Sequence, residues 1–379
     1  NYEFSNNAMY NYVVGIAFVI VAILSPILSS VADYRGNKKQ FLRFFCTMGA
    51  ISCASLYFFD KDHIYGGLIS VIIACIGFWS SLVFYNSYLP EIAAPEDRDR
   101  ISAKGFMMGY IGSVLLQLIC FVFVLKPELF GITVGKASQI SFLLVGIWWI
   151  GFSQYSFYYL PSGARSSKKV NKDVILNGFR ELKQVQQSLS ENLQLKRFLI
   201  AFFVYSMAVQ TVMLVATYFG EQEINWGDPD KKTLGLISSI LIIQLVAVLG
   251  SFLTSKASSR FGNISTLIFI NCVWVVLCVA AYFVTQPLEF YITAAFVGLV
   301  MGGIQALSRS TYSKFLPDTK DTTSYFSFYD VAEKIGIVLG MLVYGFVDQI
   351  TGSMRNAILF LVLFFIVGVI LLLRVPRKY

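Results

Sequence analysis

The segment Ser29-Ser-Val-Ala-Asp33-Tyr-Arg35-Gly36-Asn37-Lys38-Lys39 separates two apolar stretches. It combines an acid, a glycine and several bases at a point where the chain must reverse direction, and glycine permits a tight turn between two helices. A carboxylate at a membrane edge needs either a cation or a helix N-terminus as its partner. A related segment, Ser255-Lys-Ala-Ser-Ser259-Arg260-Phe-Gly262-Asn263, follows a later apolar run and shares the Gly-Asn pair. The sequence therefore predicts two equivalent connections between helices.

The repetition extends beyond these two loops. A Leu-Pro-acid sequence follows each of them, Leu89-Pro90-Glu91 in the first case and Leu316-Pro317-Asp318 in the second. The separation from Gly36 to Pro90 is 54 residues, and the separation from Gly262 to Pro317 is 55 residues. Two matches in register predict two like halves, related by an axis along the membrane normal as in parallel transporter repeats.

The composition places the chain in a membrane. Of its 379 residues, 56% are hydrophobic and 14% are charged, and the mean hydropathy is +0.66, whereas a soluble domain is about one quarter charged. The apolar stretches are continuous rather than alternating, which favours helices over a β-barrel. Eleven spans are predicted, near 10–32, 41–59, 64–89, 105–125, 139–160, 198–219, 233–254, 265–285, 288–308, 326–347 and 355–373. Their Cys residues form no C-x-x-C pair, which predicts free thiols.

The basic residues predict an orientation. The net charge of +8 is concentrated in alternate connections and in the C-terminal tail, which the positive-inside rule assigns to the cytoplasm. This distribution explains the charge better than nucleic-acid binding does. A cytoplasmic tail and an odd number of spans place Asn1 outside. We therefore expect a first helix missing upstream, which would complete six helices in each half. The alternative is that 1–9 is a true external N-terminus.

The expected domains are an N-terminal helical half over 1–160, a cytoplasmic linker over 161–197 and a C-terminal helical half over 198–379. Within the linker, apolar residues at spacings of one, three and four predict an amphipathic helix over 171–197 on the inner membrane face.

The first loop resembles the signature of the major facilitator superfamily, G-x-x-x-D-[RK]-x-G-[RK]-[RK]. Asp33, Gly36, Lys38 and Lys39 match this pattern, whereas Ser29 replaces its first glycine, Tyr34 occupies the basic position and Arg35 lies one place late. In the second loop only Arg260 and Gly262 match, and Ser259 replaces the acid.

Most of the chain is also similar to one branch of that superfamily, the autophagy-related vacuolar effluxers and their bacterial relatives. The similar stretches are Ser25-Pro26, Phe84-Tyr-Asn86-Ser-Tyr-Leu-Pro90-Glu91, 105–112, Gly302-Gly303-Ile-Gln305-Ala-Leu-Ser308-Arg309, Tyr329-Asp330 to Lys334, and Thr351-Gly352-Ser353 with Arg355. The resemblance implies an all-α, twelve-helix major facilitator fold that transports by alternating access.

Charged and amide side chains within the spans are the candidate substrate path. Lys334 lies about eight residues into its span with Glu333 beside it and Asp330 four residues earlier, so an ion pair between Asp330 and Lys334 is available. These residues either bind an anionic group or couple transport to protons, or they form a structural ion pair. The resemblance adds residues on helices that line the path, for which hydrogen bonding between helices is the alternative role: Asn86, Gln305, Tyr205, Gln210 and Thr211.

The residues at the cytoplasmic helix ends are candidates for a gate. They comprise Asp33, Arg35, Gly36, Lys38, Lys39, Glu91, Arg260, Arg309 and Asp318. The expected pairs are Arg309 with Asp330, Glu91 with Arg35, and Asp318 with Arg260. Such pairs must form in one conformation and separate in the other, and a static clamp is the alternative.

The leading expectation is a monomeric secondary active transporter of a small solute, with efflux of an amino acid or similar metabolite as the best substrate hypothesis and protons as a possible coupling ion. A drug or lipid exporter is the alternative within the class, and a non-transporting receptor or scaffold is the alternative of another class. No nucleotide-binding loop, catalytic set, metal ligand set or cofactor motif is readable, so an enzyme is not expected. The expected location is a bacterial inner membrane.

Overall fold

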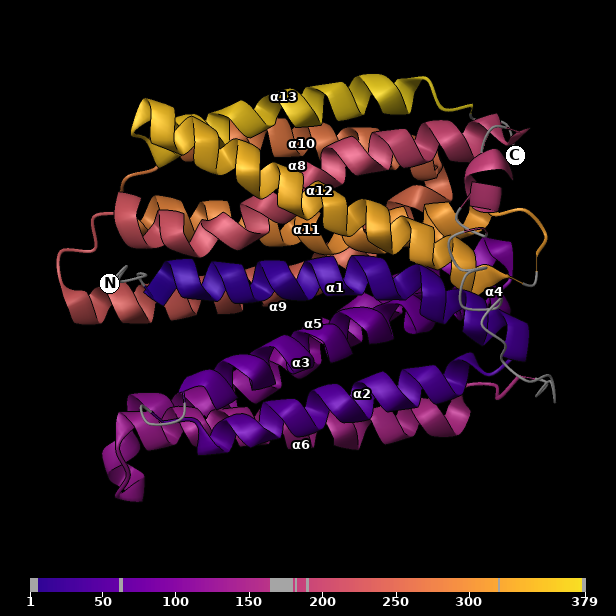
Figure 1. Ribbon diagram of the computed structural model, residues 1–379. Helices are drawn as coiled ribbons and strands as arrows, with labels where there is room; N and C mark the ends of the chain where they lie inside the picture. Colours follow the sequence, from indigo (N-terminus) through magenta and orange to yellow (C-terminus); the bar gives the residue numbers. More distant parts are fainter. Residues whose placement is uncertain are drawn as a thin grey trace. The chain divides into compact units, whose positions relative to one another are not determined.

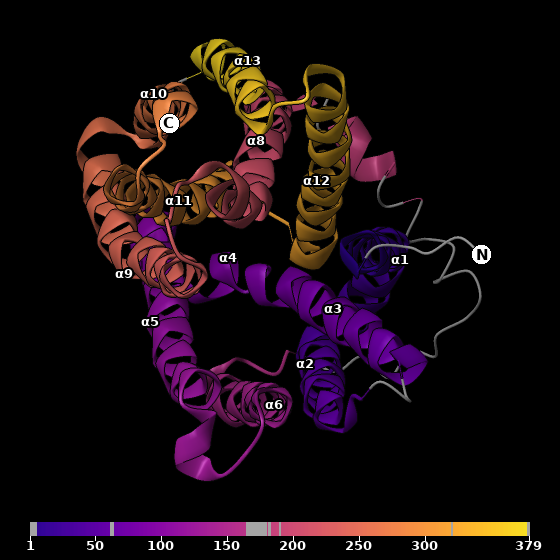
Figure 2. The same cartoon turned by 90° about the vertical axis from the view of Figure 1, so that its left-hand side faces the viewer.

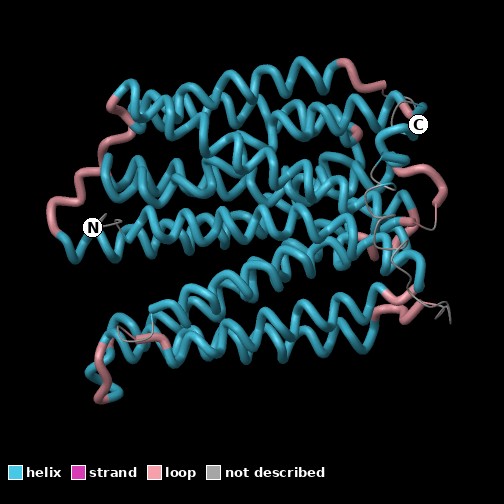
Figure 3. The backbone as a smooth tube through the Cα atoms, in the orientation of Figure 1, coloured by secondary structure: helices cyan, strands magenta, loops and turns pink. Residues whose placement is uncertain are grey.

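The chain folds into long helices. A computed structural model describes residues 6–60, 64–163, 180, 183–188, 191–319 and 321–376, with side chains from residue 13 onward. Every regular element in these ranges is helical (Figure 3). The long helices are α1 (Asn6–Arg35), α2 (Lys38–Ser55), α3 (Ile64–Asn86), α5 (Arg98–Leu125), α6 (Val134–Tyr159), α8 (Leu193–Glu223), α9 (Pro229–Phe261), α10 (Asn263–Phe283), α11 (Pro287–Phe315), α12 (Thr322–Thr351) and α13 (Met354–Leu373). Short helices are η1 (Leu56–Phe58), α4 (Leu89–Ile92), η2 (Pro95–Asp97) and η3 (Pro127–Phe130). Each predicted span thus has its helix, which confirms the all-α prediction.

Several helices extend one or two turns beyond the predicted spans. Lys256, Arg260, Arg309 and Lys314 lie in helix ends rather than in loops, and α5 already begins at Arg98. Polar end turns can continue a helix past the hydrocarbon layer because water and the interface solvate them.

The predicted amphipathic helix of the linker is only partly described. Residues 164–179, 181–182 and 189–190 lie outside the described part of the chain, as does His63. The end of the predicted helix is wrong, because α8 begins at Leu193 and its N-cap Asn192 accepts a hydrogen bond from the amide of Leu195 at 3.0 Å. The last residues of the predicted linker are therefore the first turn of a long helix.

Ten of the helices are long and apolar enough to cross a membrane. Helix α12 is of similar length, but it is not among these ten. Its apolar sequence contains Asp330, Glu333 and Lys334. Charges within a membrane helix are costly and are retained where they serve a function.

The chain forms two compact units. The first unit contains Asn1–Tyr88, Leu115–Gln187 and Asp318–Val331, and the second contains Leu89–Val114, Ser188–Pro317 and Ala332–Tyr379. Two segments cluster away from their neighbours in sequence: the start of α5 belongs to the second unit, and the start of α12 belongs to the first. The division into sequential halves over 1–160 and 198–379 stays a prediction.

In the first unit, α2 packs against α3 and α6, and α1 packs against α3 (Figure 1). The buried cluster at this packing consists of Ala32, Leu42, Phe45, Cys46, Phe84, Tyr88 and Phe157. Gly77 lies so close to Gly49 that a Cβ atom at position 77 would overlap the Gly49 backbone. The close approach of α2 and α3 therefore depends on glycine.

In the second unit, α11 packs along α9, and α13 packs against both α8 and α10 (Figure 2). Trp274 of α10 stacks on Phe365 of α13 with ring centroids 5.4 Å apart. Between α9 and α11 the backbones touch at glycines, because a Cβ atom at Gly298 would overlap the carbonyl of Ile243. Small residues at such crossings replace the hydrophobic effect, which does not hold helices together in lipid.

We predict that Gly298→Ala lowers the thermal stability of the detergent-solubilised protein. The new methyl group forces the α9 and α11 backbones apart, which costs about 1–3 kcal/mol. The matched control is Gly151→Ala in α6, where a Cβ atom meets nothing within 4 Å. Equal melting temperatures for the two variants would contradict the close packing of α9 on α11.

Candidate functional site

The first loop turns between α1 and α2 through a glycine C-cap. Gly36 has a φ of 62°, and its amide donates to the carbonyl of Asp33 at 3.1 Å. The amide of Asn37 donates to the carbonyl of Ala32 at 3.2 Å. This pair of bonds is a Schellman motif, which favours glycine because its central residue has a positive φ. The motif ends α1 at Arg35 and allows α2 to begin at Lys38.

The carboxylate of Asp33 caps the first turn of α12. It accepts hydrogen bonds from the Ser324 amide at 2.8 Å, the Ser324 hydroxyl at 2.8 Å and the Thr323 amide at 3.4 Å. A helix N-terminus attracts a negative charge through its unpaired amides and its dipole. Of the two partners expected for this acid, the structure places the helix N-terminus there. We call Asp33, Thr323 and Ser324 the first latch.

The two lysines of the loop hold other helix ends in the first unit. Lys38 donates to the carbonyl of Ser87 at 3.0 Å and to the hydroxyl of Thr322 at 3.4 Å. Lys39 donates to the carbonyl of Leu160 at 2.6 Å, just beyond the last residue of α6. Cations at helix C-termini satisfy unpaired carbonyls. The loop therefore ties together the ends of α3 and α6 and the start of α12.

The second loop forms a different cluster in the second unit. Gly262 has a φ of 82°, and the buried Asn263 donates from its side chain to Asp99 Oδ1 and to Thr311 Oγ1, both at 2.9 Å. Asp99, in the first turn of α5, also accepts from Ser258 Oγ at 3.0 Å and from Lys314 Nζ at 2.7 Å. We call Asp99, Ser258, Asn263 and Lys314 the second latch.

Each latch joins an acid to hydroxyl and N–H donors, but the element that supplies the acid differs between the two. In the first, the loop supplies the acid and the helix start supplies hydroxyl and amide donors. In the second, the helix start supplies the acid Asp99, and the loop supplies Ser258 and Asn263. Ser259, which replaces the signature acid, is exposed and donates to the Lys256 carbonyl at 2.8 Å. The acid missing from the second signature is thus supplied by α5.

Sequence reasoning missed Asp99, Asn263 and Lys314 as site residues. The Gly-Asn pair that the two loops share was a signal for Asn263, because the turn accounts for the glycine of the pair but not for the asparagine. The loop sequence gave no signal for Asp99, since it comes from a helix about 160 residues earlier in the chain.

Arg309 contacts the start of α5. Its Nε donates to the Ser102 hydroxyl at 3.0 Å, and its NH2 group donates to the Ser102 carbonyl at 2.9 Å. The guanidinium carbon lies 4.6 Å from the centroid of the Phe106 ring. These bonds satisfy a side chain that is only 6% exposed.

The three predicted gate pairs stay predictions, because each joins residues of different units. They are Arg309 with Asp330, Glu91 with Arg35, and Asp318 with Arg260. Arg35, Glu91, Arg260 and Asp318 are exposed, and Asp330 is buried.

A charged pair lies in the middle of α12. Glu333 follows the start of the helix by 11 residues, or about 16 Å at about 1.5 Å per residue. Its Oε2 lies 3.3 Å from Lys334 Nζ, and its Oε1 accepts from Gln210 Nε2 of α8 at 2.8 Å. Asp330 is buried one turn earlier on α12. Of the predicted path residues, Gln210, Glu333 and Lys334 are thus brought together.

A second polar contact joins the middle of α5 to α11. The Tyr110 hydroxyl donates to Gln305 Oε1 at 2.8 Å, and Gln305 Nε2 lies 3.4 Å from the Met213 sulfur of α8. Tyr110 was not among the predicted path residues.

The remaining predicted path residues have other surroundings. Tyr205 is 1% exposed and shares a hydrogen bond of 2.7 Å with Ser308. Thr211 is fully buried and donates to the carbonyl of Met207 at 2.7 Å. Tyr205 thus makes the contact between helices that the alternative role predicts, whereas Thr211 bonds within α8. Asn86 is the last residue of α3, in the first unit.

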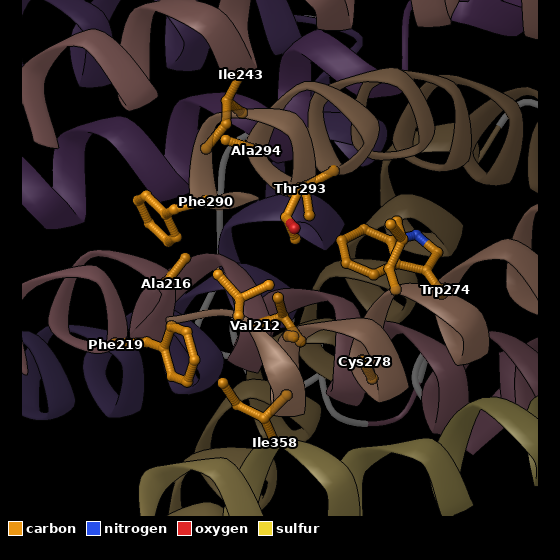
Figure 4. Close-up of a pocket in the computed structure, with 14 residues that line it drawn as sticks. Val212, Ala216, Phe219, Ile243, Trp274, Cys278, Phe290, Thr293, Ala294 and Ile358 are labelled. Atoms are coloured by element: carbon orange, nitrogen blue, oxygen red, sulfur yellow. The ribbon is translucent and has the colours of Figure 1, made fainter. Parts of the chain in front are cut away.

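The second unit also contains an apolar cavity of about 60 Å³. Figure 4 shows Phe219 and Phe290 on one side of it and Trp274 on the other. The hydroxyl of Thr293 donates to the carbonyl of Glu289 at 2.9 Å. The lining has no charged residue, so this cavity differs from the polar candidate site: Val212, Ala216, Phe219, Ile243, Trp274, Leu277, Cys278, Ala281, Val284, Phe290, Thr293, Ala294, Val297 and Ile358.

Solved structures identify the fold. The chain matches the fucose:proton symporter FucP of E. coli with a TM-score of 0.71 at 15% identity, over 97% of this chain and 90% of that chain. It matches the human organic anion transporter MFSD10 with a TM-score of 0.68 at 13% identity, over 97% and 84% of the two chains. The protein is therefore a multi-pass membrane protein with the major facilitator fold.

Sequence comparisons identify the family of the chain. The family model described as "Vacuole effluxer Atg22 like" matches residues 1–98 and 94–378, and the chain belongs to this family. An uncharacterized MFS-type transporter of Bacillus subtilis, YxiO, is 32% identical over 98% of this chain and 86% of its own length. Autophagy-related protein 22-1 of Penicillium rubens is 24% identical over 97% of this chain and 74% of its own length. The resemblance predicted from the signature loop is confirmed.

We predict that Asp33→Ala increases hydrogen exchange in the first turn of α12. Removing the cap leaves the amides of Thr323 and Ser324 without their acceptor, which costs about 0.5–2 kcal/mol. The comparison is hydrogen–deuterium exchange of peptides covering 322–331, with Arg35→Ala on the exposed side of the same loop as the control. Unchanged exchange in these peptides would show that the cap does not stabilise α12.

We predict that Asp99→Asn destabilises the protein more than Asp99→Asn combined with Lys314→Met. The single variant leaves the half-buried ammonium of Lys314 without its carboxylate, which costs about 1–3 kcal/mol, and the double variant removes that charge. Melting temperatures of Asp99→Asn, Lys314→Met and the double variant measure the coupling between the two residues. Strictly additive losses would contradict an ion pair between these residues.

Proposed function

We propose that the chain is a secondary transporter that moves a small solute by alternating access. The observation that carries the proposal is the pair of Glu333 and Lys334 in the middle of α12, held by Gln210 of α8. Ionisable groups at this depth are expensive and mark substrate or ion paths. The major facilitator fold of the chain and its family support the same conclusion.

The solute path in this proposal contains the polar groups in the middle of the helices. Glu333, Lys334 and Gln210 form one part, and Gln305 with Tyr110 forms another. Asp330 and Asn86, which belong to the first unit, stay candidate path residues. Tyr205 and Thr211 support the packing around the path rather than contact the solute. Protons are the proposed coupling ion, carried by the acidic residues of α12.

The latches serve as gate contacts that open during the cycle. Helix α12 carries Ser324 of the first latch and Glu333 nine residues later, about 14 Å apart along the helix. Helix α5 carries Asp99 of the second latch and Tyr110 eleven residues later, about 16 Å apart. A rigid helix that contacts both regions can pass a movement at the solute to a latch, provided that it has two arrangements.

The proposed direction is efflux, and the proposed substrates are amino acids or similar metabolites. The description of the family as vacuole effluxers supports the direction. Drug or lipid export is the alternative within the class. The bacterial relative supports a bacterial inner membrane as the location, and the basic connections support a cytoplasmic C-terminus. We propose that the protein acts as a monomer.

Counterflow in liposomes tests the proposal. Liposomes with the full-length protein are loaded with one unlabelled solute at a time and receive the labelled form outside. We expect transient accumulation of at least one small solute and its loss in Lys334→Ala. The control is Lys232→Ala, which removes the exposed ion pair of Lys232 with Glu221.

Folded protein that exchanges no solute in such a panel would overturn the transporter proposal and favour a receptor or scaffold. If counterflow occurs but uphill transport does not respond to a proton gradient, the coupling role of Asp330, Glu333 and Lys334 is wrong, and facilitated diffusion remains.

A further inference from the structure

We propose that Glu333 is the solute-binding member of the α12 pair and that it binds a protonated primary amine on the solute. The inference rests on the proposed function, and it specifies the solute chemistry that the site selects. It replaces the expectation that Lys334 recognises an anionic group, one of the roles considered from the sequence.

The two members of the pair differ in exposure. The side chain of Lys334 is 1% exposed, whereas that of Glu333 is 19% exposed. A solute that reaches this part of α12 therefore meets the carboxylate. An anionic group would have to approach Glu333 closely before it contacted the ammonium of Lys334, and like charges repel strongly where water is scarce.

The depth of Glu333 indicates that its exposed face is in contact with water. It lies about 16 Å along α12 from the start of the helix, in the middle of its length. A carboxylate that faced the hydrocarbon there would be very costly, and charged groups within membranes face a bundle interior or a water-filled space. Solutes can reach a carboxylate that has such access.

The carboxylate of Glu333 can also accept further hydrogen bonds. A carboxylate accepts about four hydrogen bonds, and each oxygen of Glu333 has one contact, Gln210 at 2.8 Å and Lys334 at 3.3 Å. The Lys334 contact is longer than the about 2.7–2.9 Å typical of strong charge-assisted bonds. Glu333 is thus oriented by Gln210 and only loosely held by Lys334. An ammonium group with three N–H donors can bind to it without displacing Gln210.

Helix α12 also contacts α8 at a point away from the pair of Glu333 and Lys334. On the face that meets α8, Gly340 is so close to Met207 and Thr211 that a Cβ atom would overlap them. The close approach of α12 to α8 thus has a basis at Gly340, seven residues away from Glu333.

Two kinds of solute carry a primary ammonium, amino acids and amines that lack a carboxylate. The experiment uses liposomes with the full-length protein and labelled solutes of four classes: lysine and leucine, cadaverine and putrescine, glutarate and lactate, and glucose. We expect counterflow only for solutes with a primary amine. Lysine and cadaverine share a carbon chain, so comparing them shows whether the carboxylate is also required.

The variants test Glu333 itself. For the transported solute, we expect Glu333→Gln to raise KM by about tenfold or more, equivalent to about 1.4 kcal/mol, with Glu333→Asp intermediate. In wild-type protein, acetylation of the solute's amine should weaken competition by a similar factor. In Glu333→Gln this difference should disappear, an effect that a structural role of Glu333 does not produce. Gln210→Leu, which removes the orienting donor, should also raise KM.

The outcomes separate the two proposals. Counterflow restricted to glutarate, lactate or glucose would overturn the assignment of Glu333 and leave the transporter intact. Counterflow of an amine with the same KM in Glu333→Gln, or with an acetylation effect that persists in that variant, would also overturn it. The absence of counterflow for every solute, with folded protein, would overturn the proposed function and this inference with it.

Discussion

The capping of α12 by Asp33 is the interaction on which the arrangement of the first unit depends. One carboxylate accepts three hydrogen bonds from two successive residues at the start of α12. The same loop positions Lys38 and Lys39 on the ends of α3 and α6. The glycine turn at Gly36 makes this possible, because it ends α1 and directs the acid and the two lysines toward different helix ends. Without the cap, the start of α12 loses three hydrogen bonds to this loop.

The second unit contains a similar contact, in which the helix start supplies the acid and the loop supplies the donors. Asp99 at the start of α5 takes the part of the acid, and Asn263 and Ser258 of the second loop take the part of the donors. Lys314 adds a positive charge beside a carboxylate that is 7% exposed. Both α5 and α12 thus begin at a latch and carry a candidate path residue further along, Tyr110 in one case and Glu333 in the other. The repeat is preserved in the geometry although the acidic position of the signature is not.

The sequence allowed some of this to be predicted. The spans followed from apolar runs, and the positions of Asp33 and Gly36 followed from a local pattern in which a turn and a carboxylate are needed. Asp99 and Lys314 could not be predicted as a pair, because tertiary packing brings them together from distant helices. The roles of Glu333 and Lys334 depend on how much of each side chain is exposed. Neighbouring positions on a helix do not reveal this difference in sequence, since it depends on what packs against each face. For the same reason, Thr211 was predicted to line the path, although its hydroxyl donates to a carbonyl of its own helix.

Transport by alternating access requires the first latch to open during each cycle. A direct measurement uses protein whose native cysteines are replaced and which carries Asp33→Cys with Ser324→Cys, so that a disulfide can lock the latch. Counterflow is then measured in the same liposomes after oxidation and again after reduction. We expect oxidation to abolish counterflow and reduction to restore it, whereas the single-cysteine variants should not respond. Equal counterflow in the locked and reduced protein would contradict this requirement.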